Sequence, residues 1–165
     1  STLFPYTTLF RSNLSREEML SLGFIPAAED LVFFGQTGRG KTHMATAPGI
    51  AAASAGYPVR FWQTAQLVTR LGKAKREGTP GRLLADVGRS RLLALDEFGH
   101  VPFDADGARL PFQVISESHG RRGVIFTTNV EFSRWGTVFA DDKLAAAVDR
   151  VVHHGRLRLD RKSVV

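Results

Sequence analysis

The feature that most limits what this chain can fold into is a glycine-rich loop between an apolar run and a helix-forming segment. Residues 31–34 are Leu-Val-Phe-Phe, and the loop that follows fits the pattern GxxxxGK[ST]. The loop comprises Gly35, Gln36, Thr37, Gly38, Arg39, Gly40, Lys41 and Thr42. Its glycines permit close approach of backbone N–H groups, and the start of the next helix adds partial positive charge. The pattern predicts a site for nucleotide phosphates.

The last two residues of the loop have the chemistry that this site needs. We expect Lys41 to reach the β- and γ-phosphates of the nucleotide, and the Thr42 hydroxyl to hold Mg²⁺. The rival fingerprint of dinucleotide-binding proteins, GxGxxG, does not fit, because His43 stands where its third glycine belongs.

Two further motifs follow apolar segments that have the character of buried strands. Residues 92–95 lead into Asp96 and Glu97, and residues 124–128 lead into Asn129. We expect Asp96 to assist Mg²⁺ and Glu97 to polarise the water that attacks the γ-phosphate. Asn129 could bond both the γ-phosphate and that water, although a turn or helix-cap role fits it better when it is taken in isolation.

Apolar strands and helical segments alternate along the chain. Strands are expected at 31–34, 59–62, 92–96 and 124–128, and helices at 15–22, 41–54, 65–76, 104–118, 132–139 and 142–152. This alternation predicts an α/β fold, in which a parallel sheet is flanked by helices on both faces.

The two ends of the chain differ in character from the rest. Residues 1–12 and 160–165 are consistent with one oligonucleotide translated in opposite directions, as a sequencing adapter would be. We therefore expect two non-native tails around a single domain, residues 13–159, that is truncated at both ends.

Composition narrows the functional classes only slightly. The formal net charge of +6 permits nucleic-acid binding without establishing it. The absence of cysteine suits a reducing cytoplasm, where we expect the protein to act. No apolar run reaches the roughly 20 residues of a membrane helix, so no membrane partner is expected.

Together these motifs resemble a known family. The phosphate loop with His43, the acid pair with Gly99, and the Thr-Thr-Asn129 segment look like the IstB-like ATPases. Phe112-Gln-Val-Ile-Ser116 and Phe132-Ser-Arg-Trp-Gly136 add to the likeness. These proteins are transposition helpers of an insertion-sequence family, close to the DnaC helicase loaders within the AAA+ superfamily.

The resemblance carries implications beyond the motifs themselves. It implies a P-loop NTPase core of the AAA+ type, ATP and Mg²⁺ as ligands, DNA binding, a homo-oligomer on DNA and a transposase as partner. It also implies that Arg150 reaches the γ-phosphate of a neighbouring subunit.

A basic helical segment is the candidate for DNA contact. Arg70, Lys73 and Arg76 lie within one expected helix and could follow the phosphate backbone. An ordinary solvated helix face explains the same charges equally well.

Two prolines depart from the family pattern. Pro48 and Pro111 fall inside expected helices, where each would cost about 3 kcal/mol or more.

Three functional hypotheses follow from the motifs, the resemblance and the two prolines. They are an ATP-hydrolysing transposition helper, a DnaC-like replicative helicase loader, and a truncated nucleotide-binding module without turnover. A metabolic P-loop kinase is disfavoured, because Asp96-Glu97 with Asn129 is a hydrolase arrangement.

Overall fold

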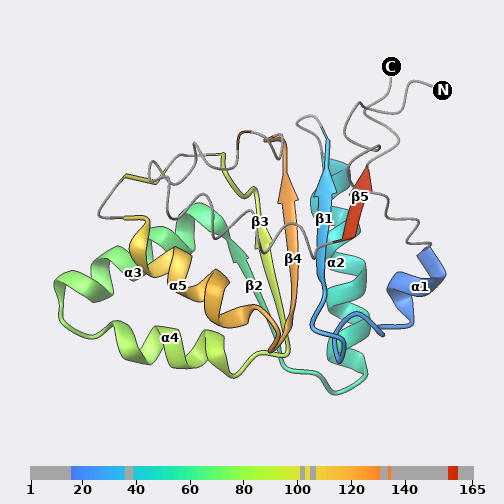
Figure 1. The fold of residues 1–165 in the computed structure, drawn as a ribbon, viewed down its shortest axis with the longest axis horizontal. Helices are drawn as coiled ribbons and strands as arrows, with labels where there is room; N and C mark the ends of the chain where they lie inside the picture. The colour runs from blue at the N-terminus through green and yellow to red at the C-terminus, as the bar shows by residue number, and fades with distance from the viewer. Residues whose placement is uncertain are drawn as a thin grey trace.

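A parallel sheet with the strand order β2-β3-β4-β1-β5 forms the centre of the protein (Figure 1). The computed structural model describes residues 16–35, 39–100, 103–104, 107–130, 134 and 156–159, with residues 39–40 and 156–159 described by their backbone alone. The strands are β1 (Asp30–Phe34), β2 (Val59–Gln63), β3 (Leu92–Asp96), β4 (Gly123–Thr128) and β5 (Arg156–Leu159). The helices are α1 (Arg16–Leu20), α2 (Arg39–Ser54), α3 (Thr64–Arg76), α4 (Pro80–Gly88) and α5 (Arg109–Ser118). The α/β fold with a parallel sheet is thereby confirmed.

The three central strands are buried along their whole length. Every residue of β1, β3 and β4 is buried, in keeping with their nearly uninterrupted apolar sequences. Such runs are typical of parallel strands that are covered on both faces. The edge strand β2 instead alternates between half-buried and exposed residues, and its Phe61 is 46% exposed.

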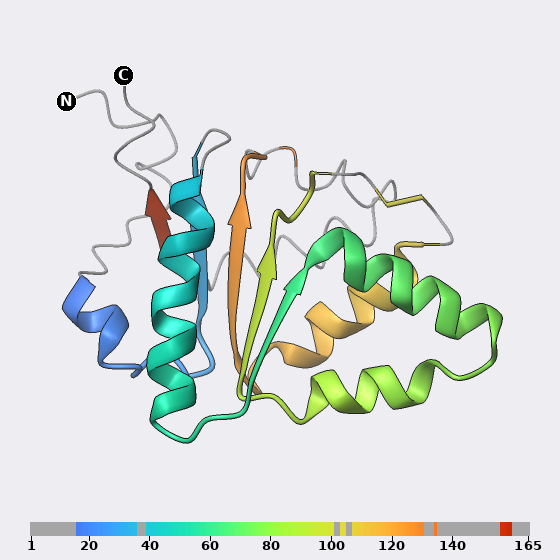
Figure 2. The ribbon, with the colours of Figure 1, turned by 180° about the vertical axis from the view of Figure 1, so that it is seen from behind.

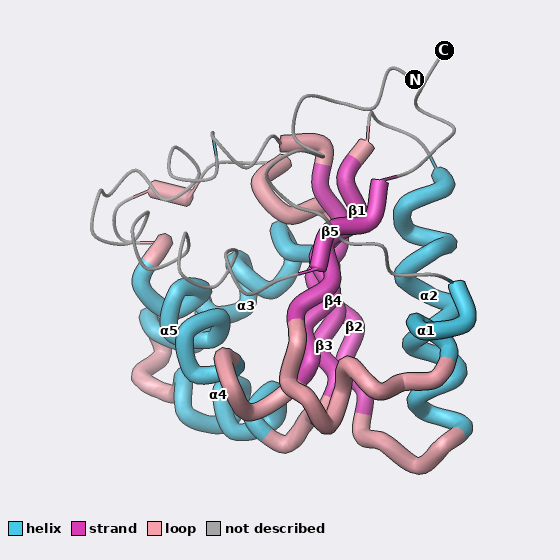
Figure 3. Tube along the Cα trace, turned by 45° about the vertical axis from the view of Figure 1, so that its right-hand side comes forward, coloured by secondary structure: helices cyan, strands magenta, loops and turns pink. Residues whose placement is uncertain are grey.

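Helices cover both faces of the sheet, as the two opposite views and the edge-on view show (Figures 1, 2 and 3). Helices α1 and α2 lie on one face, where Ala45 and Ala52 pack with Leu31, Ala94 and Ile125. Helices α3, α4 and α5 lie on the other, where Leu67, Val87 and Val114 pack with Leu93 and Phe126. None of the helices that the structure describes has the length and apolar character needed to cross a lipid bilayer.

Several element boundaries differ from the sequence-based expectation. Helix α4 and strand β5 were not predicted, and α5 begins at Arg109 rather than at residue 104. Pro80 at the start of α4 is a favourable first-turn residue, and Arg60 on β2 holds this helix with two hydrogen bonds of 3.0 Å to Asp86. The helices expected at 132–139 and 142–152 lie outside the described residues.

The two prolines have different consequences. The expectation that Pro111 interrupts a helix interior is wrong, because Pro111 is the third residue of α5. Amides of the first turn have no partner within a helix, so a proline there removes no helical hydrogen bond. Pro48 does lie inside α2, where the helix continues on both sides of it and the proline is buried. The backbone hydrogen bond to the Met44 carbonyl is absent at this point.

A buried carboxyl group stands at the first residue of β1. Asp30 is 4% exposed, and its Oδ1 makes no hydrogen bond among the described residues. Burial raises the pKa of Asp30 to about 7, although a backbone hydrogen bond from Val124 acts in the opposite direction. The folded protein therefore keeps this carboxyl protonated at a pH where the unfolded chain has already ionised it.

We expect Asp30 to lower stability as the pH rises from about 4 to about 7, because unfolding releases its proton in that range. Replacing it in Asp30→Asn should raise the free energy of unfolding at pH 8, by about 4 kcal/mol at most, and change it little near pH 4. Urea denaturation across this pH range measures the difference. Glu77→Gln, at an exposed position, is the matched control and should show no such trend. Parallel pH profiles for wild type and Asp30→Asn would contradict the assignment.

Candidate nucleotide-binding site

The residues predicted to bind nucleotide converge at the carboxyl edge of the sheet. Strand β1 ends at Phe34 before the phosphate loop, β3 ends at Asp96, and β4 ends at Thr128. Because β4 lies between β3 and β1, these three ends are neighbours. Ligands of open parallel sheets bind at this edge.

Lys41 lies in the first turn of α2 and folds back over the loop. Its Nζ donates a hydrogen bond of 2.8 Å to the carbonyl oxygen of Gly35, and only 7% of the residue is exposed. The ammonium group is therefore held at the helix N-terminus, where the helix dipole also favours anions. Residues 36–38 of the predicted loop lie outside the described residues, and Arg39 and Gly40 are described by backbone alone.

Thr42 and Asp96 meet across the site. The Thr42 hydroxyl lies 3.1 Å from each carboxylate oxygen of Asp96, although 54 residues separate them in sequence. A hydroxyl beside a carboxylate is an oxygen donor set that suits Mg²⁺, which is commonly held by one or two protein oxygens together with nucleotide phosphates. The residues present thus fit the predicted metal, with Thr42 and Asp96 as the groups that would hold it.

Asp96 is buried and fixed from several directions. It is 5% exposed, and its Oδ1 also accepts a short hydrogen bond from the hydroxyl of Thr127 on β4. Its carbonyl oxygen accepts a hydrogen bond of 2.8 Å from the Thr64 hydroxyl at the start of α3. The carboxylate therefore has one orientation, towards Thr42.

Glu97 is exposed at the same edge, in an unusual backbone conformation. Its φ is +54°, in the left-handed region that costs about 1–2 kcal/mol for a residue with a Cβ. Its amide donates to the Thr127 hydroxyl at 2.8 Å, and its Oε2 accepts a hydrogen bond of 3.1 Å from Gln63. The carboxylate is open to solvent, as a group that polarises water must be.

Sequence reasoning missed Gln63, whose side chain orients Glu97. Gln63 ends β2, and the parallel register pairs it with Asp96 at the end of β3. A polar residue at a strand end has no motif of its own. Only the pairing of β2 with β3, which brings the two strand ends together, reveals its relation to the acid pair.

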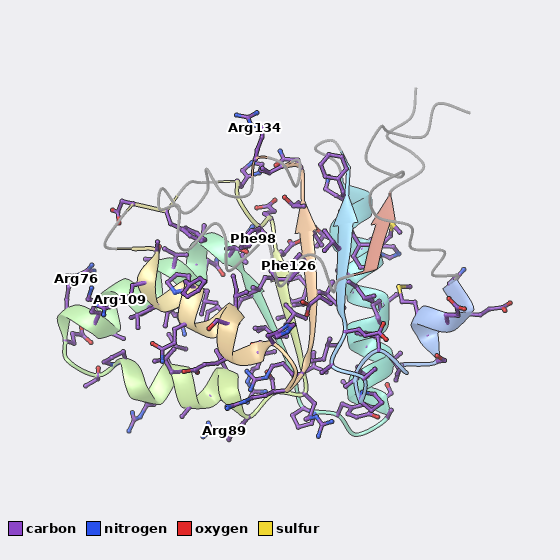
Figure 4. All side chains as sticks on the ribbon, in the orientation of Figure 1. Arg76, Arg89, Phe98, Arg109, Phe126 and Arg134 are labelled. Carbon is purple, nitrogen blue, oxygen red and sulfur yellow. The ribbon has the colours of Figure 1, made fainter. Side chains whose placement is uncertain are left out.

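An aromatic contact supports the turn that carries Glu97. Phe98 is 1% exposed, and its ring packs edge-on against Phe126 at 5.2 Å and Phe103 at 6.2 Å between centroids (Figure 4). This buried ring prevents the turn from moving away from the sheet edge.

The remaining predicted residues are Asn129, Arg150 and the candidates for DNA contact. Asn129 follows β4 directly and is exposed at the carboxyl edge, between the strand ends that carry Asp96 and the phosphate loop. Arg150 lies outside the described residues. The DNA candidates Arg70, Lys73 and Arg76 are all exposed on α3, with Arg76 near the outer end of this helix (Figure 4).

Arg70 has a second contact that bears on its availability. Its guanidinium carbon lies 5.3 Å from the centre of the Trp62 ring, a cation–π contact. Stacking of this kind restricts the side chain and leaves the N–H groups at its edge able to bind an anion.

We expect Lys41→Ala to lower the affinity for ATP by about 10- to 100-fold, because a charge-assisted hydrogen bond to phosphate is lost. Isothermal titration with a non-hydrolysable ATP analogue measures this change. Lys75→Ala removes an exposed lysine from α3 and is the matched control, which should bind as the wild type does. Equal affinities of Lys41→Ala and wild type would exclude this site as the nucleotide site.

Comparison with known proteins agrees with this geometry. The chain is 40% identical, over 149 residues, to a protein of insertion sequence IS232 from Bacillus thuringiensis subsp. berliner that is named for ATP binding. That match covers 88% of this chain and 60% of the relative. The chain spans between 43% and 60% of the length of the curated relatives it matches.

Solved structures share the fold. The replication initiator DnaA, bound to AMPPCP and single-stranded DNA, matches with a TM-score of 0.72 at 17% identity over 99% of this chain and 53% of DnaA. The DnaC helicase loader matches with a TM-score of 0.68 at 24% identity over 93% of this chain and 94% of that chain. At these identities, the likeness establishes a shared fold and no more.

The family model described as "IstB-like ATP binding protein" matches residues 9–162, which is nearly the whole chain. The chain therefore belongs to the family of IstB-like ATP-binding proteins.

Proposed function

We propose that this protein binds ATP with Mg²⁺, hydrolyses it, and acts as a helper ATPase in DNA transposition. The observation that carries the proposal is the convergence of Lys41, Thr42, Asp96 and Glu97 at one sheet edge. Hydrolysis requires a group that orients water, and the exposed carboxylate of Glu97 beside the metal ligands can serve as that group.

Binding and chemistry divide between two sets of groups. Lys41 and the N-terminus of α2 hold the phosphates, and Thr42 and Asp96 hold Mg²⁺, which supplies positive charge to the phosphate oxygens when bound. Glu97 is the general base that orients the attacking water, and Gln63 holds its carboxylate with a hydrogen bond of 3.1 Å. Asn129, exposed beside them, contacts the γ-phosphate and the same water.

Complete activity requires assembly on DNA. We infer a homo-oligomer in which Arg150 of one subunit reaches the γ-phosphate of the next, as the family resemblance implies. The exposed position of Glu97 supports this arrangement, because a site open to solvent gains from closure by a neighbour.

DNA and a transposase are the proposed partners. The relative from insertion sequence IS232 supports the transposase, and the DnaA structure with single-stranded DNA supports nucleic-acid binding. Arg70, Lys73 and Arg76 on α3 supply exposed positive charge for the phosphate backbone. The function requires a compartment that holds both ATP and DNA, which in a bacterium is the cytoplasm.

A DnaC-like helicase loader is the second candidate. Its support is that the DnaC structure and this chain match over nearly the full length of both. The two candidates share the ATP site and differ in the protein partner.

A third candidate is a nucleotide-binding module without turnover. It is favoured by Pro48, which lies inside the helix that begins at the phosphate loop.

We expect Glu97→Gln to abolish ATP hydrolysis while ATP binding persists, because the amide cannot accept a proton from water. The loss should be at least about 100-fold in kcat, consistent with removal of a general base. A phosphate-release assay with and without duplex DNA measures turnover and its stimulation, and isothermal titration measures binding. Glu77→Gln is an exposed carboxylate control. Full turnover in Glu97→Gln would refute the role of Glu97, and binding without turnover in wild type would favour the inert module.

We expect the combined change of Arg70, Lys73 and Arg76 to alanine to weaken DNA binding and to lower the slope of log K against log salt by about 3. Fluorescence anisotropy with labelled duplex DNA at several salt concentrations measures this slope. The control variant replaces Arg16, Arg91 and Arg121 by alanine and so removes the same number of positive charges. These three arginines are exposed on other surfaces. Equal slopes for the two triple variants would show a general charge effect and not a DNA-binding helix.

A further inference from the structure

Thr127 lies inside the candidate site, at a position that no phosphate-loop or acid motif includes. It is the penultimate residue of β4, the strand between the one that ends in Asp96 and the one that leads into the phosphate loop. Side chains alternate between the faces of a strand, so Thr127 shares the α2 face with Ile125. Asp96 shares the same face with Ala94 on β3, and the two side chains therefore meet beneath Thr42.

The Thr127 hydroxyl contacts both acids of the site at once. It forms a short hydrogen bond with Oδ1 of Asp96 and accepts a hydrogen bond of 2.8 Å from the backbone amide of Glu97. A hydroxyl has one proton to donate, and the amide uses its acceptor side, so the proton must go to the carboxylate of Asp96. Thr127 is 2% exposed, and its bond to the Asp96 carboxylate is buried from water.

The bond to Glu97 matters because of the backbone conformation there. With φ at +54°, Glu97 leaves the extended geometry of β3, and its amide can no longer continue the strand ladder. The hydroxyl of Thr127 satisfies that amide, and the next amide, of Phe98, returns to the Thr127 carbonyl at 2.8 Å. Thr127 thus holds the backbone amides of the left-handed turn that lets the Glu97 carboxylate reach Gln63.

The neighbouring threonine provides a contrast. The Thr128 hydroxyl bonds the Phe98 carbonyl and the Val130 amide, which are both backbone groups of the adjoining turns. Within the part of the chain that the structure describes, Thr127 is the residue whose side chain bonds both members of the acid pair.

We propose that Thr127 is a positioning residue that aligns the metal-side acid Asp96 and the water-orienting acid Glu97 through a single hydroxyl. The inference rests on the proposed ATPase function and adds a specific requirement to it. Removal of the hydroxyl releases the Asp96 carboxylate from one partner and takes from the Glu97 amide the acceptor that holds it. Both acids then lose their orientation together, while Lys41 and the phosphate loop are untouched.

The test compares Thr127→Val, which keeps the shape and removes the hydroxyl, with Thr127→Ser, which keeps the hydroxyl. We expect Thr127→Val to lower kcat by about 10- to 100-fold and to raise KM for Mg-ATP in step with its weaker Mg²⁺-dependent binding, and Thr127→Ser to recover kcat to within a few-fold of wild type. Ser90→Ala removes a buried hydroxyl that bonds the Val87 carbonyl, away from the site, and it controls for a general loss of stability in thermal melts.

A second readout separates this inference from the proposed function. Affinity for a non-hydrolysable ATP analogue is measured with Mg²⁺ and with EDTA. Thr127→Val should lose most of the affinity gained from Mg²⁺ and keep the affinity in EDTA, because only the Asp96 side of the site is disturbed. A wild type that binds nucleotide without turnover would refute the ATPase proposal, and this Mg²⁺ dependence would still test Thr127.

Two outcomes would overturn the proposal. One is a folded Thr127→Val with wild-type kcat and Mg²⁺ dependence. The other is a Thr127→Ser as defective as Thr127→Val, since the hydroxyl would then not be the group responsible. If Thr127→Val does not fold, Thr127→Cys takes its place, because a thiol is a weak donor and acceptor of similar size, and the same losses are expected.

Discussion

The hydrogen bond between Thr42 and Asp96 is the contact on which the candidate site depends. It joins the first turn of α2 to the end of β3, and it forms only because α2 packs across the sheet with Ala45 and Ala52 in the apolar core. The phosphate-binding and metal-binding groups are therefore aligned by hydrophobic burial some distance away. A core substitution beneath α2 would alter the site without touching any of its polar atoms.

Strand β4 determines how the remaining groups are arranged. Its central place between β3 and β1 lets its terminal residues contact the acid pair on one side and the loop on the other: the Thr128 carbonyl accepts the Gly35 amide at 3.2 Å, and Thr127 bonds both acids. Its apolar residues supply the rigidity that makes these contacts specific, because all six of its residues are buried. The strand thus combines structural and chemical roles.

The sequence predicts the parts of this protein that have a strong local signal. Buried apolar runs located β1, β3 and β4, and the loop and acid pair followed from their residue types. Helix α4 is only nine residues long and begins at Pro80 after Gly78 and Thr79, which are typical of a loop, so the segment was not recognised as a helix. Strand β5 is a short Arg-Leu-Arg-Leu segment without a continuous apolar run. Gln63 was not identified, and Thr127 was named only as part of the Thr-Thr-Asn129 segment, because their contacts with the acid pair depend on how the strands are paired, which a single sequence does not specify.

Pro48 divides α2 into two halves, one attached to the phosphate loop and the other packed in the core. The first half begins at the phosphate loop, and the second holds Ala52 in the core. Where the Met44 carbonyl lacks its helical partner, one hydrogen bond of the helix is missing, and the helix bends most easily at this point. A bound anion that shifts Lys41 would therefore bend α2 near Pro48, and the burial of Ala45 and Ala52 would limit how far the shift reaches.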